Sequence, residues 1–258
     1  MEQLLRVALI QYDVEWENIK LNLQKLDSLC TSLTVSADII VLPEMFATGF
    51  TMNPEHFTKS DTNKVLDWML DKSAVNNSVL MGSTPFKDEG DYYNRLLITF
   101  PDGSHEFYDK RHLYTMGEEH LHYKPGKLRK IFSIKGWKVL PLICYDLRFP
   151  VWSRNDVEYD LLIYSSNWPS VRSDVWSTLL KARAIENQSY VVGLNRLGTD
   201  GRGILHNGES KVISPKGEIL LDMVSYERTE TIELDSKSLM SFRKKFPVLN
   251  DRDTFIIK

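Results

Sequence analysis

The thiol of Cys144 stands where an apolar stretch of the chain meets a polar one. The residues after Lys138 read VLPLI, a pattern that predicts a buried strand. Polar residues follow Cys144 at once, and Pro150 allows a helix to begin nearby. A thiol at such a strand end can face a pocket, where α/β proteins place reacting groups. Taken alone the stretch favours a core cysteine, since free Cys is among the most buried residue types.

Two charged residues follow other predicted strands. Glu44 comes after the strand 38–42, and Lys110 comes after the strand 105–108. Burying a carboxylate or an ammonium is costly unless the charges compensate one another, so a pocket shared with Cys144 would let them pair. Spacing alone does not place these three residues together.

A shared pocket would support attack of a thiolate on a carbonyl carbon. A carboxylate such as Glu44 can take the proton of the Cys144 thiol, provided that burial raises the pKa of this carboxylate toward neutral pH. The ammonium of Lys110 can stabilise the developing oxyanion, and the backbone N–H of Tyr145 can supply a second donor. These residue types therefore indicate covalent catalysis by a cysteine.

The elements that must position these residues alternate along the chain. Apolar runs predict strands at 4–12, 38–42, 78–84, 92–100, 105–108, 128–134, 137–143, 161–165, 189–195, 210–214, 219–223 and 230–234. Helical spacing predicts helices at 18–33, 61–75, 173–188 and 236–246. Residues 109–126 have no clear period and are interpreted as a long functional loop, and 251–258 as a tail. This mixture predicts one α/β domain over residues 1–258.

Two predicted helices have a definite buried side. Cys30 falls on the apolar stripe of the helix 18–33, so we expect it in the core. The helix 61–75 should bury Val65, Trp68, Met69 and Ala74.

Composition excludes several classes of protein. The 258 residues are 42% hydrophobic, enough for a sizeable core, and carry a net charge of -3, which gives no support for nucleic-acid or anionic-membrane binding. No apolar run approaches the ~20 residues of a membrane helix, and no signal peptide is apparent. The two cysteines fit neither a metal site nor a disulfide framework. We expect a soluble cytoplasmic protein with free thiols.

Three motifs together resemble the signatures of the nitrilase, or carbon–nitrogen hydrolase, superfamily. They are Pro43-Glu44, Tyr108-Asp109-Lys110-Arg111-His112-Leu113 and Cys144-Tyr145-Asp146-Leu147-Arg148-Phe149-Pro150. They occur in the family's order and rough spacing, and the resemblance covers essentially the whole chain. Within the superfamily the chain is most similar to the omega-amidases, which hydrolyse the terminal amide of 2-oxoglutaramate and 2-oxosuccinamate. Residues 118–126 (EEHLHYKPG) and 165–169 (SSNWP) contribute to this narrower match.

The resemblance implies roles for the matched residues. Cys144 would be the nucleophile, Glu44 the general base and Lys110 the group that stabilises the transition state. Glu119, six residues before Pro125, matches a second family glutamate that positions the site, and the adjoining Glu118 is the competing assignment.

The resemblance also implies an architecture and partners. The family fold is an α-β-β-α sandwich of two mixed sheets, and its members usually form homodimers through helices next to the nucleophile. The implied enzyme is a cofactor-free amidase acting on a small-molecule amide. A nitrilase, an N-carbamoyl amino-acid hydrolase and a deaminated-glutathione amidase are alternatives. A further alternative is a catalytically inactive interaction module. The presence of all three catalytic residue types argues against it.

Other residues are candidates for the pocket. Arg148, four residues after Cys144, could bind a substrate carboxylate, or it could pair with Asp146 or another acid to hold the turn, and we favour the structural role. We expect aromatic and apolar side chains at the pocket wall or entrance, namely Trp168, Tyr114, Phe50, Phe46 and Met116.

Three remaining features are interpreted as having no role in catalysis or binding. His112, His120 and His122 lie in the long loop, but no acid–His spacing there matches a zinc ligand set, so we expect no metal. Gly201-Arg202-Gly203 reads as a surface turn, and Arg243-Lys244-Lys245 as a solvated helix face.

Overall fold

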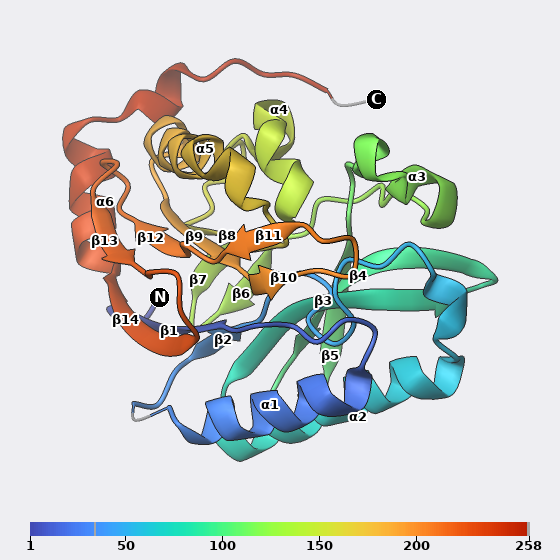
Figure 1. Ribbon diagram of the computed structural model, residues 1–258. Helices are drawn as coiled ribbons and strands as arrows, with labels where there is room; N and C mark the ends of the chain where they lie inside the picture. The colour runs from blue at the N-terminus through green and yellow to red at the C-terminus, as the bar shows by residue number, and fades with distance from the viewer. Residues whose placement is uncertain (34, 257–258) are drawn as a thin grey trace.

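Two six-stranded mixed sheets lie face to face in the computed structural model, which describes residues 1–33 and 35–256 (Figure 1). The first sheet has the order β14-β1-β2-β3-β4-β5, and the second has the order β13-β12-β9-β8-β7-β6. The strands of the first sheet are β1 Leu4–Gln11, β2 Ile39–Val41, β3 Val79–Asp88, β4 Asp91–Thr99, β5 His105–Asp109 and β14 Arg228–Asp235. Those of the second are β6 Phe132–Ile134, β7 Trp137–Ile143, β8 Leu161–Ser166, β9 Tyr190–Asn195, β12 Lys211–Ile213 and β13 Ile219–Asp222.

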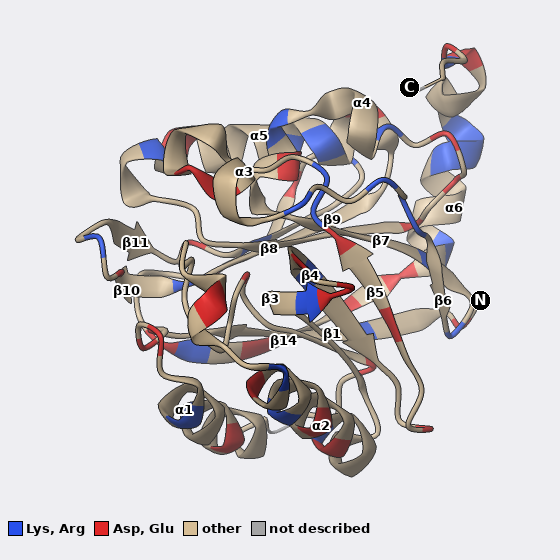
Figure 2. Ribbon diagram, turned by 90° about the vertical axis from the view of Figure 1, so that its right-hand side faces the viewer, with Lys and Arg blue, Asp and Glu red and all other residues tan. Residues whose placement is uncertain are grey.

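Helices cover the outer face of each sheet. The first sheet is covered by α1 and α2, and the second by α4 and α5, with α6 at its side (Figures 1 and 2). The helices span α1 Ile19–Thr31, α2 Lys59–Asn76, α3 Glu119–His122, α4 Pro150–Ser153, α5 Ser173–Asn187 and α6 Ser236–Lys245. The layers are therefore α-β-β-α, and the predicted fold class is confirmed. None of the helices in the described part of the chain is both long and apolar enough to cross a membrane.

Alternating side chains of the inner strands build two cores. Val7 and Leu9 of β1 belong to the cluster between the sheets, and Ala8 and Ile10 belong to the cluster beneath α1 and α2. Successive side chains of a strand point to opposite faces, so a strand covered on both faces is apolar throughout. Cys30 is buried in the second cluster, so its predicted core position is confirmed.

The buried side of α2 differs from the prediction at one position. Val65 and Met69 are buried and Trp68 is partly buried, as expected, but Ala74 is exposed. The buried residue one turn after Met69 is Ser73, whose hydroxyl donates to the carbonyl oxygen of Thr99 at 2.9 Å. A serine fits this buried stripe because its hydroxyl finds a backbone acceptor.

Short elements occur where the sequence predicts loops. The segment 109–126 contains the 3₁₀ helix η2 Thr115–Gly117 and the one-turn helix α3. A hairpin of β10 Leu197–Thr199 and β11 Leu205–Asn207 flanks the predicted turn at 201–203, whose residues are exposed. The strands of this hairpin, LGT and LHN, contain no apolar run that would predict them. The predicted tail begins with the end of the 3₁₀ helix η5 Val248–Asp251, and residues 257–258 lie outside the described part.

Arg243 contradicts the prediction of a solvated basic face on α6. Its guanidinium donates to the carbonyl oxygens of Gln188 and Tyr159 at 2.9 and 2.6 Å, and to the Asp160 carboxylate at 3.0 Å. Lys244 and Lys245 are exposed, as predicted. Arg243 is drawn inward because it binds one backbone acceptor between α5 and β9 and another just before β8, which the sequence of α6 does not reveal.

The parallel strands determine where the polar residues gather. The pairs β1–β2 and β2–β3 are parallel in one sheet, and β7–β8 and β8–β9 are parallel in the other. Ligands in α/β folds bind beyond the carboxyl ends of such strands. Glu44 follows β2, Cys144 follows β7 and Asn167 follows β8. The two sheets thus bring three polar residues to the same end of the sandwich.

Candidate active site

Three charged side chains meet in the interior. The Lys110 ammonium donates to Glu44 Oε1 at 2.8 Å and to Glu119 Oε1 and Oε2 at 3.1 and 2.9 Å. Lys110 directly follows β5 and Glu119 opens α3, and all three side chains are buried. Of the two adjoining glutamates, Glu119 therefore lies in this cluster, whereas Glu118 has a left-handed backbone (φ 63°) and is exposed.

One ammonium between two carboxylates leaves an excess negative charge, which neutral donors stabilise. Asn94 Nδ2 donates to Glu44 Oε1 at 2.8 Å and to Glu119 Oε1 at 2.9 Å. The backbone N–H of Asn167 donates to Glu44 Oε2 at 2.9 Å, and that of Tyr114 donates to Glu119 Oε2 at 2.6 Å. Hydrogen bonds from neutral donors to a carboxylate favour its charged form.

The pKa shifts in this cluster follow from burial and charge. Burial favours the neutral form of Lys110, but the Glu119 and Glu44 carboxylates outweigh it, so the pKa of Lys110 lies above its ordinary value. Burial raises the pKa of Glu119, and the Lys110 ammonium opposes this rise. Lys110 therefore stays an ammonium throughout the neutral range.

Cys144 lies at a sharp turn of the backbone. It follows β7 and opens the 3₁₀ helix η3 Cys144–Arg148 with a φ of 40°, in the left-handed region. Such a backbone costs a residue other than glycine about 1–3 kcal/mol, and it is typical of functional turns. The turn is held by the buried Asp146 carboxylate, which accepts from the Ile143 N–H at 3.1 Å and the Tyr108 hydroxyl at 2.8 Å.

Two opposite charges act on the Cys144 thiol. Burial raises its pKa well above the ordinary value and the Glu44 carboxylate raises the pKa further, whereas the Lys110 ammonium lowers it. The thiol therefore holds its proton at neutral pH before substrate binds, and a base is needed to make it a nucleophile. Burial raises the pKa of Cys30 to about 11, and Cys30 lies in the core.

A cavity of about 890 Å³ opens onto the thiol. The residues predicted for the site that line it are Glu44, Phe50, Lys110, Tyr114, Met116, Cys144, Tyr145, Arg148 and Trp168. Glu119 lies behind Lys110, and Tyr114 and Tyr145 contact each other edge to face with ring centroids 5.1 Å apart.

Phe46 contradicts the prediction that it lines the entrance. Its side chain is fully buried in the core beneath α2, with its ring centroid 6.0 Å from that of Trp68. A Cβ at Gly82 would lie 2.8 Å from the Phe46 ring, so the glycine leaves the space that this ring occupies.

Within residues 1–33 and 35–256, Arg148 forms no ion pair with Asp146 or with another acid, so the favoured structural role is wrong. The Asp146 carboxylate also accepts from the backbone N–H of His112 at 3.0 Å, in addition to its bonds from Ile143 and Tyr108, and lies 2.8 Å from His112 Nδ1. The Arg148 guanidinium instead lies over the Trp168 ring, 5.1 Å from its centroid, at the wall of the cavity.

The structure adds residues that sequence reasoning missed. Asn94 lies within β4, and Arg172, Arg202 and His206 line the cavity. Asn is depleted in strands, so an amide within the predicted strand 92–100 was a usable signal. The other three lie on short elements without a pattern.

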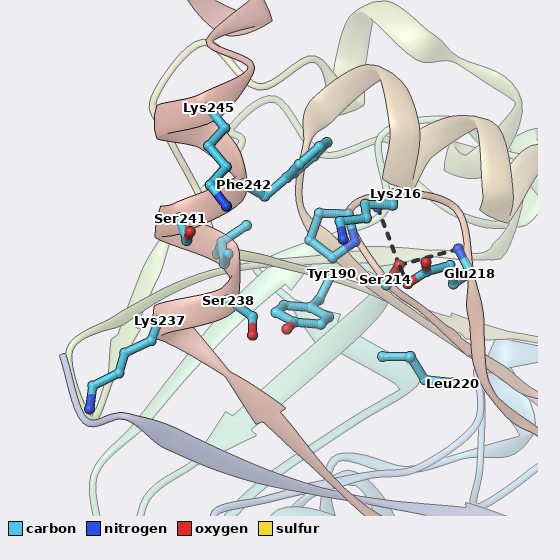
Figure 3. Close-up of a pocket in the computed structure, with 12 residues that line it drawn as sticks. Tyr190, Ser214, Lys216, Glu218, Leu220, Lys237, Ser238, Ser241, Phe242 and Lys245 are labelled. Atoms are coloured by element: carbon cyan, nitrogen blue, oxygen red, sulfur yellow. Dashed lines mark hydrogen bonds between the residues drawn. The ribbon is translucent and has the colours of Figure 1, made fainter.

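A second cavity, of about 530 Å³, lies between α6 and the turn 214–218 (Figure 3). Lysines and serines line it, among them Lys216, Lys237 and Lys245 (Figure 3). None of the residues predicted to do chemistry belongs to its lining. The cavity at Cys144 is therefore the candidate active site.

Comparison with known proteins identifies the class of enzyme. The sequence profile of the carbon–nitrogen hydrolase family matches residues 6–244, so the chain belongs to this family. It is thus a hydrolase that acts on carbon–nitrogen bonds, and the resemblance to the nitrilase superfamily is confirmed.

Individual relatives cover nearly the whole chain. Omega-amidase YafV of Escherichia coli (strain K12) is 45% identical over 252 residues, 97% of this chain and 98% of that protein. The 2-oxoglutaramate amidase of Bacillus subtilis (strain 168) is 32% identical over 251 residues, 95% of this chain and 96% of that protein. The crystal structure of XC1258 from Xanthomonas campestris, a CN-hydrolase superfamily protein, gives a TM-score of 0.96 at 36% identity and covers 100% of both chains.

Removal of the Asn94 amide tests the electrostatics of the cluster. We expect Asn94→Ala to lower the free energy of unfolding by about 2–3 kcal/mol, because hydrogen bonds to charged groups contribute about 1.5–3 kcal/mol. Urea denaturation measures this loss. Asn63→Ala on the exposed side of α2 is the control, with an expected change within about 0.5 kcal/mol. Equal changes in the two variants would contradict this account of the cluster.

Proposed function

We propose that the chain, as one carbon–nitrogen hydrolase domain over residues 1–258, hydrolyses the terminal amide of 2-oxo acids. The proposed substrates include 2-oxoglutaramate and 2-oxosuccinamate, and the products are the dicarboxylic 2-oxo acid and ammonia. The observation that carries this proposal is a buried thiol at the floor of a cavity that Glu44 and Lys110 also line. The 45% identity to an omega-amidase over 97% of the chain supports the substrate class.

The first half-reaction releases ammonia. Glu44 takes the proton of the Cys144 thiol, and the thiolate attacks the amide carbon. The Lys110 ammonium and the Tyr145 N–H stabilise the oxyanion of the tetrahedral intermediate. Glu44 then gives its proton to the nitrogen, the carbon–nitrogen bond breaks, and ammonia leaves a thioester on Cys144.

The second half-reaction hydrolyses the thioester, and Glu44 again acts as the base. Glu44 takes a proton from water, and the resulting hydroxide attacks the thioester carbon. The carbon–sulfur bond breaks, the acid product leaves, and Glu44 returns the proton to the sulfur of Cys144. Glu119 takes no proton in this scheme. Its role is to fix the Lys110 ammonium through the two hydrogen bonds described above.

The walls of the cavity suit an anionic substrate with a short carbon chain. Trp168, Tyr114 and Phe50 supply apolar area, and the Lys110 ammonium lies 5.0 Å from the centroid of the Phe50 ring. Arg148 supplies a cation four residues after the nucleophile, in the same turn. A carboxylated amide therefore fits this lining better than a neutral nitrile does.

The Cys144 assignment predicts the loss of all turnover on a single substitution. We expect Cys144→Ala to abolish ammonia release and Cys30→Ala to retain it, because Cys30 lies in the core. Near-normal ammonia release by Cys144→Ala would refute the mechanism.

The same assignment predicts where the acyl group is attached. In Glu44→Gln, whose turnover should fall by about 10²–10⁴-fold, mass spectrometry of a quenched reaction should find the acyl group on the Cys144 peptide. A turnover close to that of the unmodified protein would remove Glu44 from the role of base.

A homodimer in the cytoplasm completes the proposal. Val151 on α4 and Ile185 on α5 are about half exposed, on the helices that adjoin the nucleophile turn. Apolar side chains on such a surface favour contact with a second copy, and free thiols suit a reducing compartment. We expect a mass in dilute solution of about twice 29.9 kDa. A single 29.9 kDa species would contradict the dimer.

The substrate assignment predicts an order of rates. We expect ammonia release from 2-oxoglutaramate to be faster than from glutamine, asparagine, an N-carbamoyl amino acid, deaminated glutathione or a simple nitrile. Steady-state kcat/KM values measure this order. Faster turnover of nitriles would refute the omega-amidase assignment and leave the cysteine mechanism standing.

A further inference from the structure

The cavity wall carries more available cations than anions. Arg148, Arg172 and Arg202 line it, and within residues 1–33 and 35–256 none of them lies within ion-pair distance of a carboxylate. The two acids of the lining are already bonded. Glu44 is held as described above, and Asp200 Oδ1 accepts from the backbone N–H groups of Arg202 and Ile204, each at 2.9 Å.

Arg172 and Arg202 come from different elements but bind the same short segment. Arg172 ends the 3₁₀ helix η4 Ser170–Arg172, and its Nη2 donates to the Tyr114 hydroxyl at 3.3 Å. Arg202 lies at the tip of the β10–β11 hairpin, and its Nη1 donates to the carbonyl oxygen of Gly117 at 3.3 Å. A Cβ on Gly117 would lie 2.7 Å from the Tyr114 ring, so the ring rests on this glycine.

The two guanidinium groups therefore bind one segment of the cavity wall, and η4, which carries Arg172, contacts β11 of the hairpin that carries Arg202. Each has five N–H donors, and each makes a single long hydrogen bond to the segment 114–117. Neighbouring cations repel one another, and a bound carboxylate would relieve this repulsion while accepting paired N–H bonds. The arrangement therefore suits an anionic group that a ligand brings into the cavity.

We propose that Arg172 and Arg202 together bind the carboxylate at the end of the substrate remote from the amide. This inference rests on the proposed amidase function and names the residues that determine its substrate class. Arg148 differs because it belongs to the nucleophile turn, whereas its contact with the Trp168 ring resembles that of Arg172 with the Tyr114 ring.

Charge then explains selection of a 2-oxo acid over an amino acid. An α-ammonium group would bring a further cation beside the carboxylate and close to the two arginines. The lining offers such a group two carboxylates against the four cations Lys110, Arg148, Arg172 and Arg202. Glu44 is paired with Lys110, and Asp200 Oδ1 already accepts two backbone N–H bonds. A carbonyl at that position carries no charge and avoids this repulsion.

Selectivity between an anionic and a neutral amide tests the pair. We compare kcat/KM for 2-oxoglutaramate, which is anionic, with kcat/KM for pentanamide, which is neutral. The ratio of the first value to the second should fall about 10- to 100-fold in Arg172→Met and in Arg202→Met. The main cause should be a higher KM for 2-oxoglutaramate. Lys237→Met, which removes the same charge from α6 in the lining of the second cavity (Figure 3), should leave the ratio unchanged.

Binding without turnover separates this inference from the proposed function. Calorimetry of Cys144→Ala with 2-oxoglutarate should show a Kd about 10- to 100-fold weaker when Arg172→Met or Arg202→Met is added. A protein that hydrolyses no amide would refute the proposed function, and the calorimetry would still decide the subsite. An unchanged Kd in both variants, or a loss confined to Arg148→Met, would overturn the assignment.

Discussion

A lysine ammonium held between two carboxylates in the interior is the interaction on which the rest of the structure depends. Moving each such ion out of water costs several kcal/mol, and this cost is offset only where charges and hydrogen bonds are all in place. Lys110 meets Glu44 and Glu119, while Asn94 and the backbone N–H of Asn167 take up the remaining charge. These groups come from both sheets and from the long loop, so the site exists only when the whole sandwich is assembled.

Much of the fold could be predicted because its inner strands are apolar on both faces. Buried parallel strands read as continuous apolar runs, so β1, β2, β7, β8 and β9 were recognisable. The short hairpin β10–β11 was not, because its strands, LGT and LHN, contain no apolar run. Within the site, motif order identified Glu44, Lys110 and Cys144 as candidates. Their convergence could not be predicted, since it depends on contacts between distant residues: Lys110 and Glu44 are 66 positions apart, and Asn167 and Glu44 are 123 apart.

Side-chain direction was the part that the sequence could not supply. Phe46 and Arg148 both follow strand ends, yet Phe46 points into the core and Arg148 points to the cavity. In each case the deciding partner is distant in sequence: the space left by Gly82 and the ring of Trp168. The result is a cavity whose acids are all bonded and whose arginines are available. Such a positive cleft in a chain of net charge -3 would concentrate small anions against the overall charge of the protein.

The left-handed backbone at Cys144 has a consequence for how this enzyme can evolve or be engineered. A glycine would adopt a φ of 40° without strain, so the turn by itself favours the one residue that has no side chain to react. Selection for conformational stability and selection for turnover therefore act in opposite directions at this position. A relative freed from the need for catalysis would drift toward glycine here, and a stabilised variant designed from backbone geometry alone would lose its nucleophile first.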